Sequence, residues 1–271
     1  MSKKEKKKSK RQLEKEYVPL KGLMGNATDY HVYSMRFGDR LTGFLIGFGI
    51  AFAIMFIFFR SMIFCIPVSL IVGFCSVRPY KHYKEKKRKE KLLLQFKDML
   101  EGLVTSYSAG SNTLNAFVDC EEDLKNIYGE ESDIVQELRI IINGLSNGLI
   151  IEDLLNDFAA RSDLEDVQSF ADVFAIANRQ GGNVKQIVSD TRTVINDKIE
   201  MEMEISSLLN GGKNEINILI VMPVLVVLVL GGDGDMSIVT NTMTNVVVKF
   251  VCLAIYAGAY MLGRKIMNIK V

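Results

Sequence analysis

Four apolar stretches constrain the fold of this 271-residue chain more than any other feature of its sequence. They are Leu41–Phe59, Ser61–Val77, Ile216–Leu230 and Val246–Leu262. An α-helix rises about 1.5 Å per residue, so about 20 residues cross a hydrocarbon core about 30 Å thick. Each stretch is long enough, or nearly long enough, to cross such a core. The sequence therefore predicts an integral membrane protein with four transmembrane helices.

The first two stretches are expected to form a hairpin. Residues 41–77 contain one charged residue, Arg60, and as one straight helix they would run about 55 Å, nearly twice the membrane thickness. We therefore expect the chain to reverse near Arg60, whose long side chain can reach the lipid headgroups. Gly43 and Gly47 lie four residues apart, a spacing that lets helix backbones approach closely in lipid. Packing within one chain is the more economical interpretation, and packing between chains is the alternative.

Lysine and arginine residues are concentrated on one side of the expected spans. Residues 1–40 hold 11 Lys/Arg against 5 Asp/Glu, residues 78–91 hold 8 against 2, and residues 264–271 are also basic. The turn near Arg60 and the loop 231–245 carry almost no basic charge. Because positive flanks stay on the cytoplasmic side, we expect a multi-pass protein of the cytoplasmic membrane with both termini inside. The basic flanks would also attract anionic lipids.

The segment between the second and third spans is predicted to be helical throughout. Its apolar residues recur at steps of three and four residues, which is typical of helices with one buried face. The expected helix ends and starts lie near Gly110, Ser111 or Asn112, Gly129, Ser132, Gly148, Ile151, Arg161, Asp163, Gly181, Gly182 and Asn183. The predicted fold class is all-α, with two transmembrane hairpins and a cytoplasmic six-helix bundle. The predicted parts are a basic arm 1–40, a hairpin 41–77, a helical domain 78–214, a hairpin 215–263 and a tail 264–271.

The helical domain is strongly acidic. Residues 92–214 hold 9 Lys/Arg and 22 Asp/Glu, the opposite of the charge that a nucleic-acid-binding surface needs. The densest acidic cluster is Asp119, Glu121, Glu122, Asp123, Glu130, Glu131 and Asp133. Such a run is either a solvated face or a docking surface for a basic partner.

The sequence predicts no enzyme, no cofactor and no metal site. Residues 210–214 resemble a phosphate-binding loop only superficially, because no Ser or Thr follows the lysine and the segment follows a helix instead of a strand. His31 and His82 are expected to be solvated surface residues. Asp233 and Asp235 fall short of the six to eight oxygen ligands of calcium, and we expect them in a turn between spans.

Three segments of the helical domain carry a recognisable pattern. They are LLLQFKDMLEGLVTSYSAGSNTLNAF (92–117), LSNGLIIEDLLNDFAARS (145–162) and VQSFADVFAIANRQGG (167–182). This order of helix, Ala-Gly turn, helix and Gly-Gly ending resembles the type II secretion system F-domain family, and most closely its TadB-like branch, which serves Tad (Flp) pili. The matching family positions are Gly110, Gly148, Arg161, Gly181, Gly182 and Pro223. The resemblance covers roughly residues 90–225, and residues 1–40 match nothing in it.

The resemblance implies a non-catalytic inner-membrane platform protein that couples a cytoplasmic secretion ATPase to pilin assembly. Its partners would be that ATPase, pilin or pseudopilin subunits, a second platform protein or a second copy of itself, and lipids. The acidic cluster would then be the ATPase docking surface. Lys249, just inside the outer end of the fourth span, can reach the headgroups, and contact with a pilin or an ion is the alternative. A subunit of a transporter or channel is the alternative function, although the spans offer few polar residues for a conduit.

Overall fold

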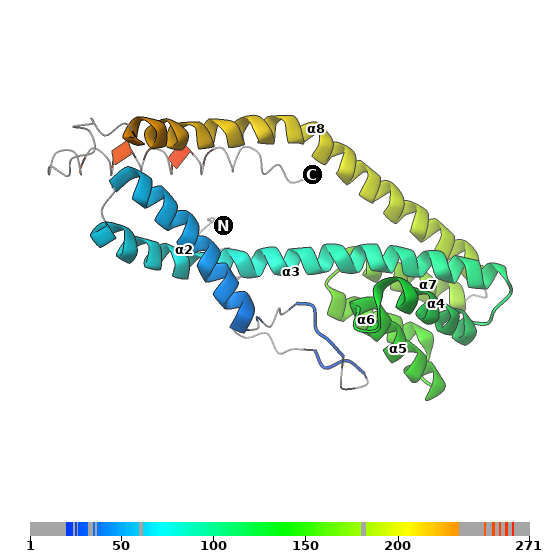
Figure 1. Cartoon of the computed structure of the whole chain (residues 1–271). Coiled ribbons are helices and arrows are strands. Elements are labelled where there is room, and N and C mark those ends of the chain that lie inside the picture. The colour runs from blue at the N-terminus through cyan, green and yellow to red at the C-terminus, as the bar shows by residue number, and fades with distance from the viewer. Residues whose placement is uncertain are drawn as a thin grey trace, which may run out of the picture. The chain divides into compact units, whose positions relative to one another are not determined.

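The computed structural model describes residues 20–23, 25, 27–31, 35, 37–59, 62–179 and 183–232, together with a few isolated positions after residue 246. Its helices are α2 (Phe37–Phe59), α3 (Met62–Ser108), α4 (Thr113–Tyr128), α5 (Asp133–Ser146), α6 (Ile151–Ser162), α7 (Glu165–Arg179) and α8 (Val184–Gly232) (Figure 1). The described residues form helices and connections without a β-strand. The predicted all-α class is therefore confirmed for this part of the chain.

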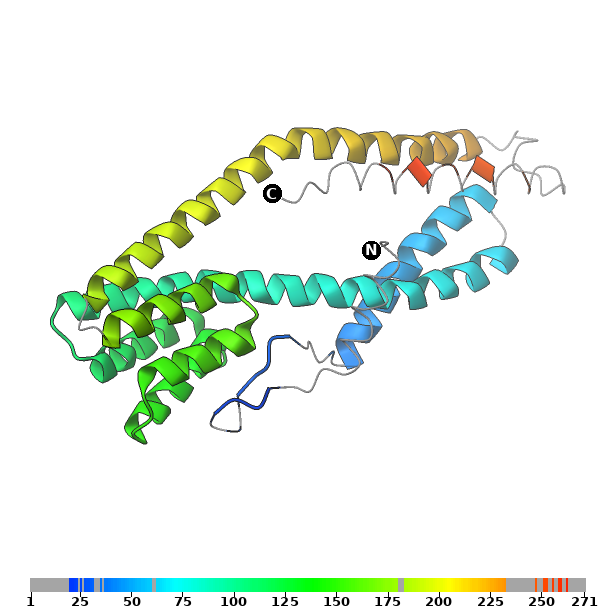
Figure 2. The same ribbon diagram turned by 180° about the vertical axis from the view of Figure 1, so that it is seen from behind.

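The chain divides into two compact units. The helical unit contains the described residues up to His31 together with Lys84–Lys198. The apolar unit contains Met35–Tyr83 and the described residues from Ile199 onward. Helices α3 and α8, of 47 and 49 residues, hold residues of both units and are the longest helices in both views (Figure 1, Figure 2). The helical unit thus begins later and ends earlier in the sequence than the predicted domain 78–214. It also includes part of the predicted arm 1–40.

In the apolar unit, α2 packs closely against the N-terminal part of α3. A Cβ atom added to Gly43 would lie 2.9 Å from Cδ1 of Tyr80, and one added to Gly47 would lie 2.3 Å from Cβ of Ser76. The two helices therefore leave no room for a side chain at either glycine. This contact confirms that the first apolar block reverses and that its glycines pack within one chain, although Arg60 itself lies outside the described residues.

One helical stretch of the described chain can cross a membrane by its length and composition. It is Phe37–Ile57, with a mean hydropathy of 2.0. By the same criteria, the described residues of Ser61–Val77 and Ile216–Leu230 do not qualify. The fourth expected span, Val246–Leu262, lies mostly outside the described residues. One helix of spanning length is therefore established, and the four spans and their orientation stay predictions.

The core of the helical unit is aromatic and aliphatic. Helix α4 packs on α5, α5 on α6, and α6 on α7. The ring centroid of Phe96 on α3 lies 6.2 Å from that of Phe158 on α6 and 5.6 Å from that of Phe170 on α7. All three rings are buried, and contacts between aromatic rings at such separations stabilise a core beyond the area they bury. The buried stripe on α3 comprises Leu92, Phe96, Met99, Leu100 and Leu103. The sequence predicts a stripe of Leu93, Phe96, Leu100, Leu103 and Tyr107, of which the middle three are confirmed, while Leu93 and Tyr107 are half-buried.

The predicted helix starts at Asn112 and Asn183 are confirmed. The Asn112 side chain accepts a hydrogen bond of 2.9 Å from the backbone N–H of Asn115 at the start of α4. Asn183 accepts one of 3.2 Å from the N–H of Gln186 at the start of α8. Each asparagine satisfies a backbone donor that has no partner within its helix. Gly110 precedes α4 with a φ of 88°, a conformation that favours glycine.

The expected helix start at Asp163 is wrong. Asp163 follows the last residue of α6 with φ 54° and ψ 34°, in the left-handed region, and α7 begins at Glu165. Aspartate adopts this conformation more readily than most residues. An aspartate before an apolar-periodic run is typical of a helix start, but here it ends the preceding helix.

Cys120 marks the close contact between α3 and α4. Its buried Sγ donates a weak hydrogen bond of 3.4 Å to the carbonyl of Met99, and a Cβ atom added to Gly102 would lie 3.0 Å from it. Burial and, to a smaller extent, the charges of Asp123 and Asp119 together raise the pKa of the Cys120 thiol to about 12. Because thiolates and not thiols react with alkylating reagents, slow alkylation of Cys120 reports an intact core.

Candidate functional site

The expected acidic docking surface lies on α4 and the turn that follows it. Four of its carboxylates are on α4, two are in the turn between α4 and α5, and one opens α5. In that order they are Asp119, Glu121, Glu122 and Asp123, then Glu130 and Glu131, then Asp133. The structure thus places the seven residues on α4, on the turn that follows it and on the first residue of α5.

Part of this acidic charge is balanced inside the helical unit. Nε of Arg139 donates to Oε1 of Glu121 at 2.9 Å, and Nζ of Lys125 lies 2.7 Å from Oε1 of Glu130. The hydrogen bond and the charge of Lys125 lower the pKa of Glu130. Glu130 therefore stays ionised, and both carboxylates already have a cationic partner.

Other members of the cluster remain more open. Glu122 and Asp123 are exposed and form no ion pair with the described part of the chain. Asp119 accepts a long hydrogen bond of 3.4 Å from a serine hydroxyl, and Glu131 accepts one of 3.5 Å from a glutamine amide. Glu122 and Asp123 are thus the carboxylates best able to meet a basic partner.

A second charged region lies around Arg161 on α6 and is almost completely buried. The side chains of Arg161 and Glu137 are each 1% exposed. Nη1 and Nη2 of Arg161 each donate at 2.7 Å to one carboxylate oxygen of Glu137, and Nε donates at 2.8 Å to Oδ2 of Asp157. This paired geometry offsets much of the free energy that burying the charges costs.

The protonation of this buried group follows from opposing effects. Burial raises the pKa of Glu137, while the hydrogen bonds and charge of Arg161 lower it. Burial acts to lower the pKa of Arg161, but hydrogen bonds and charges from Glu137 and Asp157 outweigh it and raise that pKa. The guanidinium therefore stays charged, so removing its partners would leave a buried cation.

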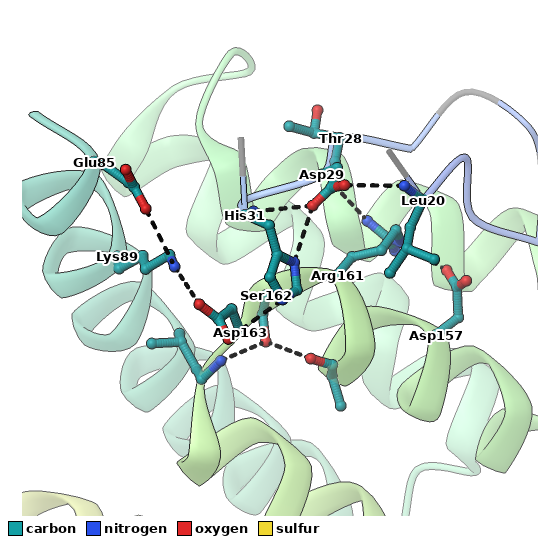
Figure 3. Close-up of polar contacts among 12 residues, drawn as sticks. Leu20, Thr28, Asp29, His31, Glu85, Lys89, Asp157, Arg161, Ser162 and Asp163 are labelled. Carbon is teal, nitrogen blue, oxygen red and sulfur yellow. Dashed lines mark hydrogen bonds and ion pairs between the residues drawn. The ribbon is translucent and has the colours of Figure 1, made fainter. Parts of the chain in front are cut away.

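The described residues of 20–31, here called the N-terminal segment, bind directly to this charged pair. Tyr30 is 3% exposed, its hydroxyl donates to Oε1 of Glu137 at 3.0 Å, and its N–H donates to the carbonyl of Arg161 at 3.0 Å. In return, Nη1 of Arg161 donates to the carbonyl of Thr28 at 3.0 Å. Figure 3 shows Thr28 of the segment beside Arg161. Part of the predicted N-terminal arm therefore belongs to the helical unit.

A second contact joins Leu23, near the start of the N-terminal segment, to Asp157 on α6. The N–H of Leu23 donates to Oδ1 of Asp157 at 3.1 Å. Gly22 has a φ of 67°, and a Cβ atom there would lie 2.5 Å from Cβ of Ala27 and 3.2 Å from Nε of Arg161. Both the backbone conformation and the space therefore require glycine at this position.

Arg88 of α3 covers the Tyr30 ring. Its guanidinium carbon lies 4.8 Å from the ring centroid, a distance typical of a cation–π interaction. Nε of Arg88 also donates to Oδ2 of Asp133 at 3.0 Å, so one expected docking carboxylate holds an internal arginine. We call Arg88, Glu137, Asp157 and Arg161 together the Arg161 seat.

The expectation that His31 is a solvated surface residue is wrong. Its side chain is 28% exposed, with Nδ1 3.1 Å from Asp29 and Nε2 3.3 Å from Asp163. Asp163 in turn lies 2.5 Å from Nζ of Lys89 on α3 (Figure 3). His31 thus joins the N-terminal segment to the end of α6, while His82 is exposed as expected.

The remaining predicted positions do not gather at one place. Gly110 and Gly148 have positive φ in turns of the helical unit, and Pro223 lies inside α8. Gly181, Gly182, Asp233, Asp235 and Lys249 lie outside the described residues. Of the positions that match the family pattern, Arg161 is the one whose side chain makes a set of polar contacts.

Comparison with known proteins adds no assignment. No family model, no curated protein and no solved structure matches this chain.

Proposed function

We propose that this chain is a non-catalytic platform protein of the cytoplasmic membrane, serving a Tad-like or type IV-like pilus or a type II-like secretion machine. In this proposal it spans the membrane four times, keeps both termini in the cytoplasm and couples a secretion ATPase to pilin assembly. The proposal starts from the family pattern in residues 92–182 and from the basic flanks of the apolar stretches.

The observation that supports this proposal most is the continuity of α3 and α8. Each helix runs without interruption between helical-unit residues and a predicted span, and Pro79 and Gly211–Gly212 lie inside the helices. Proline and glycine pairs are the usual places where a helix kinks. Unbroken helices at these positions suit a protein that passes rotation or tilt from one unit to the other.

Exposed apolar side chains support the membrane part of the proposal. Leu45 on α2 is 53% exposed, Ile71 on α3 is 65% exposed and Leu219 on α8 is 64% exposed. Many of their neighbours on the same helices are similarly exposed. Apolar faces of this extent are rare on soluble monomers and are typical of surfaces that meet lipid or other proteins.

The acidic surface supports the ATPase part of the proposal. Glu122 and Asp123 are exposed beside carboxylates that are already paired. A surface of one charge sign speeds encounter with a partner of the opposite sign and disfavours partners of the same sign. We therefore assign these two residues to the encounter with the ATPase.

A flexible insertion after Asn210 tests the coupling. Six Gly/Ser residues at this point interrupt α8 beyond the helical unit, whereas an insertion near Lys91 would also disturb the contacts of Arg88. The matched control is the same insertion after Gly110, in an exposed turn between α3 and α4. In the source organism, we expect the first variant to reach the membrane in normal amounts but to assemble no pili, and the control to assemble them.

Two results would contradict this proposal. Normal piliation with the insertion after Asn210 would show that helix continuity is not needed. Solute or ion flux through vesicles containing only this purified protein would favour the transporter or channel alternative.

A further inference from the structure

The contacts between the N-terminal segment and the helical unit have the form of peptide recognition. The N-terminal segment is a turn, closed by hydrogen bonds from the N–H of Gly25 to the Gly22 carbonyl and from the N–H of Ala27 to the Lys21 carbonyl. We infer that the Arg161 seat is a recognition site for a turn-forming, tyrosine-bearing segment, and that the N-terminal segment is its own displaceable ligand. This inference concerns residues 20–31, to which the family pattern assigns no role. It does not depend on the proposed function in pilus assembly.

Backbone groups of the segment make most of the polar contacts. The seat accepts the N–H groups of Leu23 and Tyr30 through the Asp157 carboxylate and the Arg161 carbonyl. It donates to the carbonyl of Thr28 through the Arg161 guanidinium. In peptide recognition, main-chain hydrogen bonds give affinity and side-chain pockets give specificity.

Tyr30 supplies the specificity. Its hydroxyl reaches Glu137 at 3.0 Å, while its ring lies under the guanidinium of Arg88. A phenylalanine would keep the ring contact but leave a buried carboxylate oxygen with one donor fewer. Sites built to hydrogen-bond a hydroxyl discriminate strongly against a ligand that lacks it.

The segment can leave without removing the core. Of its described side chains, Tyr30 is buried and Asp29 is 7% exposed, whereas Leu20 and Leu23 are 41% and 56% exposed. Arg161 keeps Glu137 and Asp157 from α5 and α6 when the segment departs. Segments with few buried contacts are the ones that open locally while the rest of a protein stays folded.

A labelled peptide tests the inference on the full-length protein in detergent. The probe is a synthetic peptide of residues 20–31, and the protein variant is Tyr30→Ala, which weakens the resident segment. We expect fluorescence anisotropy to show binding to this variant at least about ten-fold tighter than to the wild type, whose seat is occupied. A peptide carrying the Tyr30→Phe change should bind several-fold more weakly.

The matched control protein is Tyr83→Ala, because Tyr83 is 60% exposed and lies outside the seat. It should bind the peptide as poorly as the wild type does. Alkylation of Cys120, followed by mass spectrometry, reports whether each variant keeps its core. It should stay slow in both variants.

Three results would overturn the inference. Equal peptide binding by wild type and Tyr30→Ala would show that the peptide does not use the seat. Absence of binding to a Tyr30→Ala protein with a protected Cys120 would show that an open seat recognises nothing. Rapid alkylation of Cys120 in Tyr30→Ala would show that the segment is an integral part of the core and not a displaceable ligand.

Discussion

The acidic surface on α4 and the Arg161 seat use similar ion pairs in opposite environments. Lys125 and Glu130 are 40% and 58% exposed and lie 2.7 Å apart. Arg161 and Glu137 are each 1% exposed and also approach to 2.7 Å. Water and salt screen the first pair, whereas the second pair must be satisfied almost entirely by protein groups.

This difference separates two uses of charge in one helical unit. An exposed pair contributes little to folding, about 0 to 1 kcal/mol, so its carboxylates can change partners at small cost. A buried pair has little water to replace a missing hydrogen-bond partner, and for that reason it can select the one segment whose groups complete it. The exposed surface suits transient encounter, and the buried seat suits recognition of a defined segment.

The largest expected effect comes from breaking the buried pair. Arg161→Ala leaves Glu137 buried without its cation, and such losses destabilise proteins by about 3–5 kcal/mol. The matched control is Arg139→Ala, whose own side chain is 41% exposed and whose partner Glu121 is 18% exposed, against 1% for both members of the buried pair. We expect the control to cost about 1 kcal/mol or less. Chemical denaturation followed by circular dichroism measures both losses.

Similar losses of stability in the two variants would show that burial does not determine how much each ion pair contributes. Alkylation of Cys120 gives a second reading of the same experiment. It should become fast in Arg161→Ala at denaturant concentrations that leave Arg139→Ala protected.

Local features of the fold were predictable from the sequence. The Asn112 and Asn183 caps and the apolar stripe on α3 depend on residues within one or two helical turns of one another. The reversal of residues 41–77 follows from length alone. Such features need no knowledge of distant contacts, which is why periodicity and capping patterns predict them.

The seat was not predictable as a site because its partners are distant in sequence. Tyr30 and Glu137 are 107 residues apart, and Thr28 and Arg161 are 133 apart. One signal was nevertheless present: Glu137 falls at a core position of α5, between Ile134 and Ile141, where a charge needs a buried partner. A dense acidic run is easier to notice than a single charged residue on an apolar stripe.

The next largest effect is expected at two glycines of the N-terminal segment. Gly22→Ala and Gly25→Ala both place a side chain at positive φ, but the added Cβ meets Ala27 and Arg161 only at Gly22. No described atom lies within 4 Å of the corresponding Cβ at Gly25. We expect Gly25→Ala to cost about 1 kcal/mol from backbone strain, and Gly22→Ala about 2 to 3 kcal/mol because overpacking is added.

Destabilisation of the segment makes it open more often, and the rate of hydrogen exchange at the Tyr30 amide, measured by mass spectrometry, reports this local opening. Exchange should be fastest in Gly22→Ala, intermediate in Gly25→Ala and slowest in the wild type, with unchanged exchange in the core of α3. Equal exchange in the two variants would show that the segment does not press against the seat at Gly22.

The smallest effect on stability is expected at the acidic surface. Reversing Glu122 and Asp123 together to lysine changes two exposed side chains, so stability should move by no more than about 0.5 kcal/mol. Asp197→Lys with Glu200→Lys is the matched control, since both residues are exposed and the net charge changes equally. If α4 meets the secretion ATPase, reversal of Glu122 and Asp123 should slow association by about ten-fold at low salt, whereas the control should not slow it. The difference between the two variants should shrink as added salt shortens the screening length to about 10 Å or less. Equal slowing by both pairs would mean that net charge, and not the surface on α4, governs the encounter.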